Sequence, residues 1–141
     1  MNKGFTLIEL IVVATIISLL AAVGAVSYSV FSKNARDSRR VADLEQIRAA
    51  VELYRSNNNA YPASITFGGN LCDPAGCPPS GNLYLQKITN DPRPPYTYFY
   101  TGSAGDYTLG AYLEAGGTGS TCGACGTGIT CNYCLGPYGQ K

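Results

Sequence analysis

The chain has 141 residues and a mass of 14.9 kDa, which allows one small domain beyond any membrane segment. Its formal net charge is +1, so it lacks the broad basic surface of nucleic-acid-binding proteins, and we expect no nucleic-acid partner. Six cysteines, 17 glycines and no histidine favour an exported, disulfide-braced protein over a cytosolic enzyme, because histidine is the commonest general base and metal ligand.

A long apolar segment lies near the N-terminus. Between Leu10 and Val26, only Thr15, Ser18 and Gly24 are not plainly apolar. The wider span of residues 5–31 is long enough to cross the roughly 30 Å hydrocarbon core of a bilayer as a helix. We therefore expect residues 5–31 to form a transmembrane helix, preceded by a short polar leader at residues 1–4.

Glu9 is the one charged residue within this span. A carboxylate inside a bilayer costs about 2.5–3.5 kcal/mol unless a partner neutralises it. Cleavage between Gly4 and Phe5 would create an α-amino group one helical turn from Glu9, available in the same chain or to a neighbouring subunit. In the alternative interpretation, Glu9 lies at the headgroup level, where water and the helix dipole stabilise it.

The polar leader, Gly4, Phe5, the sequence Thr6-Leu7-Ile8-Glu9 and the apolar helix together resemble the processing and methylation motif of type IV pilins and type II secretion pseudopilins. This resemblance implies that a prepilin peptidase cuts after Gly4 and methylates the new amine of Phe5. It further implies that Glu9 helps to draw subunits into a helical filament.

Basic residues beside the apolar segment give a conflicting indication of orientation. Lys3 precedes the segment, whereas Lys33, Arg36, Arg39 and Arg40 follow it, so the positive-inside rule alone would place the C-terminal part in the cytoplasm. Pilin heads are held outside, and the resemblance therefore implies the opposite orientation. We expect a single pass through the plasma membrane with the head outside, followed by an extracellular or periplasmic filament.

The helical pattern continues beyond the span without a proline or glycine until after Asn57. We expect one helix from about Phe5 to about Ser56, close to 80 Å long, whose amphipathic continuation over residues 32–57 packs against a small sheet. Its predicted buried face consists of Leu44, Ile47, Val51 and Tyr54. Charged residues at helical spacings predict solvated pairs, or bridges between filament subunits: Arg39/Asp43, Glu45/Arg48, Arg48/Glu52 and Glu52/Arg55.

Residues 58–95 are rich in Gly, Pro, Asn and Ser and predict an irregular loop. Leu83, Leu85 and Ile88 are its expected core anchors, on a short helical turn. Residues 96–141 predict a small sheet followed by a cysteine-rich tail. Alternating residues indicate strands at 96–101 and 107–113, with a turn at 102–105 and a short third strand around 129–131.

The soluble part extends the resemblance to the major pseudopilin of type II secretion, as far as Leu113. The matching positions are Asp37, Arg40, Asp43, Tyr54 and residues 58–62, 84–85, 90–92, 95–98 and 107–109. Major pseudopilins bind calcium in a C-terminal loop supplied with aspartates, whereas Glu114 is the only acidic residue between residues 110 and 141 of this chain. Calcium is therefore not expected here, and we expect no other cofactor.

The last four cysteines form two C-x-x-C units separated by five residues. In a cytosolic protein this pattern would indicate a four-thiolate zinc site, but thiols outside the cell oxidise to disulfides. Zinc at these four residues, and free or redox-active thiols, remain the alternatives. The preferred bridges are Cys72 with Cys77, and the nested pairs Cys122 with Cys134 and Cys125 with Cys131, although spacing alone does not fix connectivity.

The chemistry-bearing residues show no catalytic constellation, so we expect no enzyme. The expected fold is α+β and pilin-like, with a long N-terminal helix packed on a small antiparallel sheet and a cysteine-rich C-terminal loop. The expected function is that of a structural subunit of a type IV filament, either a type IV pilus or a type II secretion pseudopilus, which assembles with other pilin-like subunits. The alternative is a membrane-anchored extracellular redox or zinc-binding module.

Overall fold

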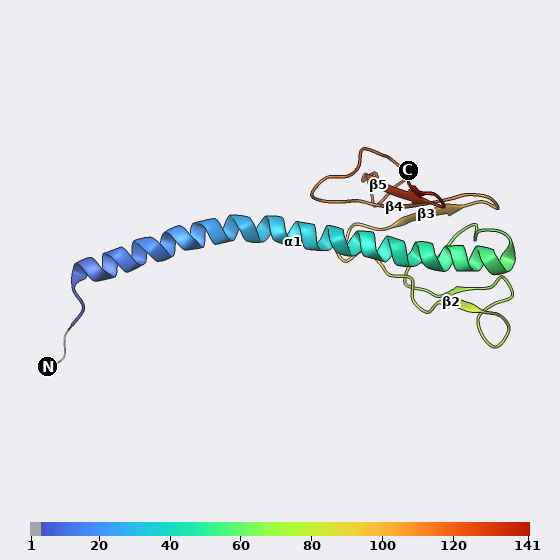
Figure 1. Ribbon diagram of the computed structural model, residues 1–141, viewed down its shortest axis with the longest axis horizontal. Helices are drawn as coiled ribbons and strands as arrows, with labels where there is room; N and C mark the ends of the chain where they lie inside the picture. Colours follow the sequence, from blue (N-terminus) through green and yellow to red (C-terminus); the bar gives the residue numbers. More distant parts are fainter. Residues whose placement is uncertain (1–3) are drawn as a thin grey trace.

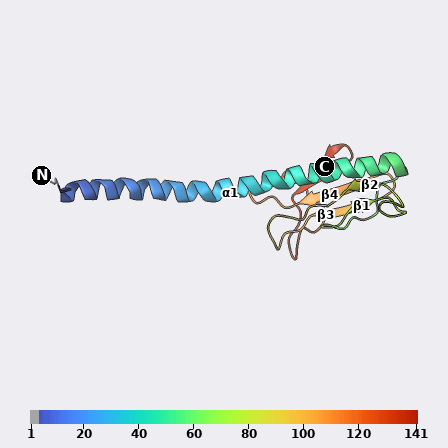
Figure 2. The same ribbon diagram turned by 90° about the horizontal axis from the view of Figure 1, so that it is seen from below.

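The computed structural model describes residues 4–141, apart from the side chains of Ala25 and Val26. The expected leader therefore lies outside the described residues except for Gly4. One long helix runs the length of the molecule, and a small head packs against its C-terminal half only (Figures 1 and 2). The N-terminal half of the helix projects from the head without contacting it.

Helix α1 spans Leu7–Asn58 and is continuous. Thr6 caps its N-terminus, and Asn59 ends it in the left-handed conformation, with φ 55° and a backbone hydrogen bond to the carbonyl of Arg55. The prediction of a single helix is confirmed, with each end two residues further along the chain than expected. The shift follows from the caps, because the helix begins after Thr6 and continues until a residue that tolerates positive φ.

The larger sheet has four antiparallel strands in the order β3-β4-β5-β6. Their bounds are Phe99–Gly102, Tyr107–Ala111, Tyr133–Gly136 and Gly139–Gln140. The hairpin of β3 and β4 matches the expectation, but β3 begins three residues late because the Thr97 amide bonds the Cys125 carbonyl instead of β4. The third strand was misplaced: Thr130 makes only an isolated bridge to Ala124, and the strand lies at β5.

A second sheet pairs β1, Leu71–Cys72, with β2, Leu83–Leu85, inside the segment expected to be irregular. The two sheets flank α1 (Figure 1). The expected helical turn is wrong, since Leu83 lies on a strand and its side chain is 42% exposed, whereas Ile88 is fully buried as expected. Short strands of two and three residues carry too little alternation to be recognised from the sequence.

The core lies where the C-terminal half of α1 meets the two sheets. Leu44, Ile47 and Val51 on α1 are fully buried, and Tyr54 is 8% exposed, so the predicted helix face is confirmed. These side chains pack against residues of both sheets and of the connecting loops. The principal partners are Tyr61, Leu71, Ile88, Tyr98, Tyr107, Leu109, Ala111, Leu113, Tyr133 and Leu135.

Candidate functional site

The N-terminal half of α1 is apolar and uncovered. Its described large side chains between Leu7 and Phe31, Val26 apart, are at least half exposed, and Phe5 is 83% exposed. α1 is the one helix among the described residues that is long and apolar enough to cross a membrane. So large an apolar surface is unfavourable in water. The geometry therefore calls for a bilayer or for other protein chains around this half.

Glu9 is held in the first turn of this half by Thr6. The Thr6 amide and the Thr6 hydroxyl each donate to Glu9 Oε2 at 2.8 Å, and the Glu9 amide donates to Thr6 Oγ1 at 3.3 Å. This reciprocal arrangement is a capping box. The sequence analysis named both residues but missed the cap, although Thr-x-x-Glu before an apolar run is its sequence signal. Glu9 thus lies at the exposed N-terminal tip of the helix, near Phe5.

A shallow groove runs along the same half of α1. Small residues at four-residue spacing, Ala14, Ser18 and Ala22, line it together with Thr15 and Leu19. The Thr15 and Ser18 hydroxyls bond carbonyls of the preceding helical turn, so they leave no unsatisfied donor in the groove. Small residues allow two helices to approach closely in an apolar environment.

A buried ion network joins α1 to the base of the head. Arg40 is fully buried and binds Asp91 through two hydrogen bonds, Nε to Oδ2 at 2.7 Å and NH2 to Oδ1 at 2.9 Å. Its NH1 atom also donates to Asp37 at 2.8 Å and to Glu114 at 2.9 Å. Three carboxylates thus surround one guanidinium, and their hydrogen bonds raise the pKa of Arg40 further above its ordinary value against the opposing effect of burial.

Glu114, just beyond β4, is the second centre of this network. Arg36 binds it through two hydrogen bonds of 2.8 and 2.7 Å, and Arg93 also donates to it. The hydrogen bonds from Arg36, and then that from Arg40, lower the pKa of Glu114 from 4.5 to about 2. Asp37 accepts the backbone amides of Glu114 and Ala115 at 2.9 and 2.7 Å, which fixes the loop after β4 against α1.

Aromatic rings cover one side of the network. The Arg40 guanidinium lies 5.2 Å from the centre of the Tyr96 ring, and Tyr96 stacks on Tyr112 with their ring centres 5.1 Å apart. The sequence analysis expected Tyr96 on a strand, whereas the structure places it before β3. It did not pair Arg40 with Asp91 or Glu114, because these residues are 51 and 74 positions from Arg40 in the chain.

The six cysteines form three disulfides: Cys72–Cys77, Cys122–Cys134 and Cys125–Cys131. This is the pairing that the sequence analysis preferred, and no cysteine is free. The last two bridges lie over Gly110 in β4, where a Cβ atom would come within 2.9 Å of Cys131 Sγ. Bonded sulfurs are not thiolates, so in this state the C-x-x-C units present no zinc ligands.

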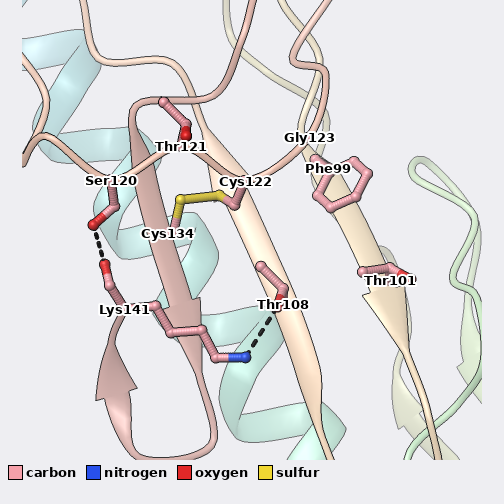
Figure 3. Close-up of a pocket in the computed structure, with 9 residues that line it drawn as sticks. All are labelled: Phe99, Thr101, Thr108, Ser120, Thr121, Cys122, Gly123, Cys134 and Lys141. Carbon is pink, nitrogen blue, oxygen red and sulfur yellow. Dashed lines mark hydrogen bonds between the residues drawn. A yellow bond between two sulfur atoms is a disulfide. The ribbon is translucent and has the colours of Figure 1, made fainter.

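A hollow of about 620 Å³ lies on the face of the larger sheet opposite α1 (Figure 3). Phe99, the Cys122–Cys134 bridge and several hydroxyl side chains line it. The Lys141 ammonium group at its rim already binds Asp106 at 2.9 Å and Thr108 Oγ1 at 3.0 Å. The residues that line this hollow do not bring a nucleophile together with both a general base and a general acid, as a catalytic site would need.

Comparisons with known proteins cover both halves of the chain. The family model of the prokaryotic N-terminal methylation motif matches residues 1–25, and the model of type II secretion system (T2SS), protein G, matches residues 30–124. Type II secretion system core protein G of Pseudomonas aeruginosa is 34% identical over 126 residues, which cover 83% of this chain and 89% of that protein. Type II secretion system core protein G of Vibrio cholerae is 28% identical over 127 residues, which cover 84% of this chain and 87% of that protein.

A type IV pilin is similar over a shorter stretch. Type IV major pilin protein PilE1 of Neisseria gonorrhoeae is 35% identical over 75 residues, which cover 53% of this chain and 46% of that pilin. No solved structure gives a significant match. The methylation motif precedes an uncovered apolar helix, and the protein G match extends over most of the head, so this chain belongs to the type II secretion system protein G family of pilin-like proteins.

Proposed function

We propose that this chain is a structural subunit of a type II secretion pseudopilus, processed by a prepilin peptidase between Gly4 and Phe5 and assembled through the N-terminal half of α1. The observation that carries the proposal is that residues 7–24 and 27–31 leave their apolar side chains exposed, next to a head with its own core. Such a helix needs a cover from outside the chain, first a bilayer and then the helices of other subunits.

The proposed assembly step is the transfer of α1 from lipid to a helical bundle. Cleavage frees the amine of Phe5, which is then methylated, and this cation pairs with Glu9 of a neighbouring subunit. Both Thr6 hydrogen bonds go to Oε2 of Glu9, so Oε1 is available to accept the neighbour's ammonium group while the cap persists. Pairing removes the cost of an uncompensated carboxylate in an apolar surrounding.

The ion network gives the head its part in this mechanism. Because Arg40 and Glu114 connect α1 to two loops of the head, the head follows any movement of the helix as a rigid body. In the membrane-resident stage we place the head outside the plasma membrane, and in the filament on its periplasmic or extracellular surface.

A secretion pseudopilus is favoured over a type IV pilus by the extent of the similarity. The matches to core protein G of Pseudomonas aeruginosa and of Vibrio cholerae cover more than four fifths of this chain, whereas the match to PilE1 covers about half of it. A pilus subunit with surface functions is the second candidate, carried by that match.

We also propose that the chain is not an enzyme and needs no cofactor. The alternative, a membrane-anchored redox or zinc-binding module, requires free thiols or bound metal at Cys122, Cys125, Cys131 and Cys134. Thiol titration and metal analysis of the purified chain separate the two, because a bridged protein gives neither a thiol signal nor zinc.

The experiment that tests the proposal is the intact mass of the protein recovered from its native membrane or from sheared filaments, before and after reduction. We expect a chain that begins at methylated Phe5 and gains six hydrogens on reduction, two for each of the three bridges. An uncleaved chain would remove the basis of the assembly mechanism. A mass that does not change on reduction would mean that the cysteines are not bridged. It would favour the alternative in which the four C-terminal cysteines bind metal or act as redox-active thiols.

A further inference from the structure

The cations that follow the apolar segment fall into two groups in the structure. Arg40 is buried and Arg36 is paired with Glu114, so both serve the head. Lys33 and Arg39 are exposed and form no ion pair with any residue that the structure describes. Arg93, from the loop beyond Asp91, joins them at the same end of the head with its side chain 52% exposed.

The carboxylates at this end face inward. The side chains of Asp37, Asp91 and Glu114 are 11%, 0% and 5% exposed. Each forms an ion pair with at least one of the three arginines of the network, which are Arg36, Arg40 and Arg93. Three positive and three negative charges cancel there. Asp43, one helical turn beyond Arg39, accepts the Tyr98 hydroxyl at 2.8 Å, so Lys33 and Arg39 together exceed it by one positive charge. The surface of the head nearest the apolar half of α1 is therefore cationic, although the chain as a whole carries only +1.

The geometry of α1 brings these cations to the level of lipid headgroups. Lys33 and Arg39 follow Phe31 by two and eight residues, which is about 3 and 12 Å along a helix axis. Side chains on a helix tilt toward its N-terminus, here toward the apolar half. The headgroup region adds roughly 5–7 Å on each side of the hydrocarbon core. Because successive residues are rotated by about 100° around the helix axis, Lys33, Arg36 and Arg39 lie within about 120° of one another on one side of the helix.

We propose that the base of the head, formed by Lys33 and Arg39 with the exposed edges of Arg36 and Arg93, binds the phosphates of anionic phospholipid headgroups in the leaflet on the head side. The inference rests on the proposed membrane-resident stage. Lysine and arginine bind phosphate through charge-assisted hydrogen bonds, and the surface continues directly from the apolar segment that enters the bilayer. Bound headgroups hold the unassembled subunit at a fixed depth until it passes to the filament.

This assignment accounts for the conflict with the positive-inside rule. Two of the four basic residues after the segment have roles inside the folded head, and the other two have a partner in the lipid. The four basic residues are then present because of ion pairs in the folded head and contacts with lipid. On this proposal they do not determine which side of the membrane the head occupies.

The test uses the full chain in neutral detergent micelles with equal amounts of phosphatidylglycerol and phosphatidylcholine of identical acyl chains. Native mass spectrometry gives the ratio of the two lipids that remain bound. We expect the chain to retain phosphatidylglycerol preferentially. The double variant Lys33→Gln/Arg39→Gln should lower the ratio at least about fivefold, the effect of roughly one cation at an anionic surface. The fold of the head should persist, because neither residue forms an ion pair within residues 4–141.

Two control variants distinguish lipid binding at the base of the head from a general effect of the net charge of the chain. Lys33→Arg/Arg39→Lys keeps both charges and should keep the ratio. Lys87→Gln removes one exposed charge from the segment after β2 and should leave the ratio unchanged. A ratio near one in the unmodified chain, no change in the double glutamine variant, or an equal fall with Lys87→Gln would each overturn the inference. A chain that is correctly processed and forms filaments but has no lipid preference overturns this inference alone, whereas an uncleaved chain counts against the proposed function.

Discussion

The two halves of α1 are one uninterrupted helix with opposite surroundings. The apolar side chains described in residues 7–24 and 27–31 are exposed, whereas Leu44, Ile47 and Val51 of the second half are completely buried by the head. The difference lies in what covers the helix, because the second half is completed by its own chain and the first half requires another molecule.

The charged residues of the two halves repeat this contrast. Glu9 is held by a residue three positions away, within a single turn, and one of its oxygens stays available. Arg40 is held by Asp91 and Glu114, 51 and 74 residues away, and its NH1, NH2 and Nε atoms are all engaged. A local cap leaves the first half without any tie to the head, while long-range ion pairs join the second half to it.

The largest effect is expected from Glu9→Leu, which removes the one charge of the uncovered half. Insertion into the membrane should be unchanged or improved, because the cost of a carboxylate in the bilayer disappears. The yield of sheared filaments should fall at least roughly tenfold, equivalent to a loss of about 1.4 kcal/mol per subunit contact. The measurement is the ratio of filament to membrane protein by quantitative immunoblot.

The matched control for this change is Thr15→Val, which also replaces a polar residue of the same half by an apolar one. Thr15 bonds only the carbonyl of its own helix, so filaments of this variant should form normally. Wild-type filament yield from Glu9→Leu would show that the subunits do not use this carboxylate.

The second prediction concerns the covered half. Arg40→Met leaves Asp91 buried without its cation and should lower the free energy of unfolding by about 3–5 kcal/mol, the usual result of breaking one side of a buried ion pair. Urea titration of the full chain in micelles, followed by the near-ultraviolet circular dichroism of the head tyrosines, gives this value. Arg39→Met, the same substitution at the neighbouring exposed position, should change it by less than about 0.5 kcal/mol. Equal effects at both positions would mean that the network does not stabilise the head.

The contrast between local and long-range contacts also explains what the sequence predicted well. The single helix, its buried face and the β3–β4 hairpin follow from periodicities within a few residues, and they were predicted to within about three residues. The preferred disulfide pairs were likewise separated by only 5 to 12 residues.

The missed features depend on residues far apart in the chain. Of the four helical charge pairs expected on α1, Glu45–Arg48 is the one that forms among the described residues. Asp43 instead accepts the hydroxyl of Tyr98, and Glu52 accepts those of Tyr61 and Tyr107. Helical spacing shows which partners are near on the helix, but not which competitors the fold brings from 9 to 55 residues away.

The third prediction concerns the pH dependence of the ion network. Because the folded head lowers the pKa of Glu114 from 4.5 to about 2, the unfolded chain binds this proton at higher pH than the folded chain. Stability from Glu114 is therefore complete above about pH 4.5 and is lost as the pH falls toward 2. Urea titrations at several pH values should show this decline.

Glu114→Gln should lower the free energy of unfolding at pH 7 by about 1.5–3 kcal/mol, as expected for hydrogen bonds to a charged group. It should also flatten the acid decline without abolishing it, because hydrogen bonds from Tyr84 and Lys141 likewise lower the pKa values of Asp73 and Asp106. An unchanged acid profile in this variant would contradict the assignment of the decline to Glu114.

The smallest effect is expected from Glu45→Gln, which breaks the exposed pair with Arg48. The two charged atoms are 3.3 Å apart, and the side chains are 48% and 27% exposed. Water and salt screen such a pair, so its loss should change the free energy of unfolding by no more than about 0.5 kcal/mol in the same urea assay. Arg48 also retains its hydrogen bond to the Pro137 carbonyl, which holds the side chain in place without the glutamate. A loss above 1 kcal/mol would mean that exposed salt bridges on α1 also stabilise the folded head. Burial would then not explain why Arg40 contributes more to the free energy of unfolding than the other arginines of this helix.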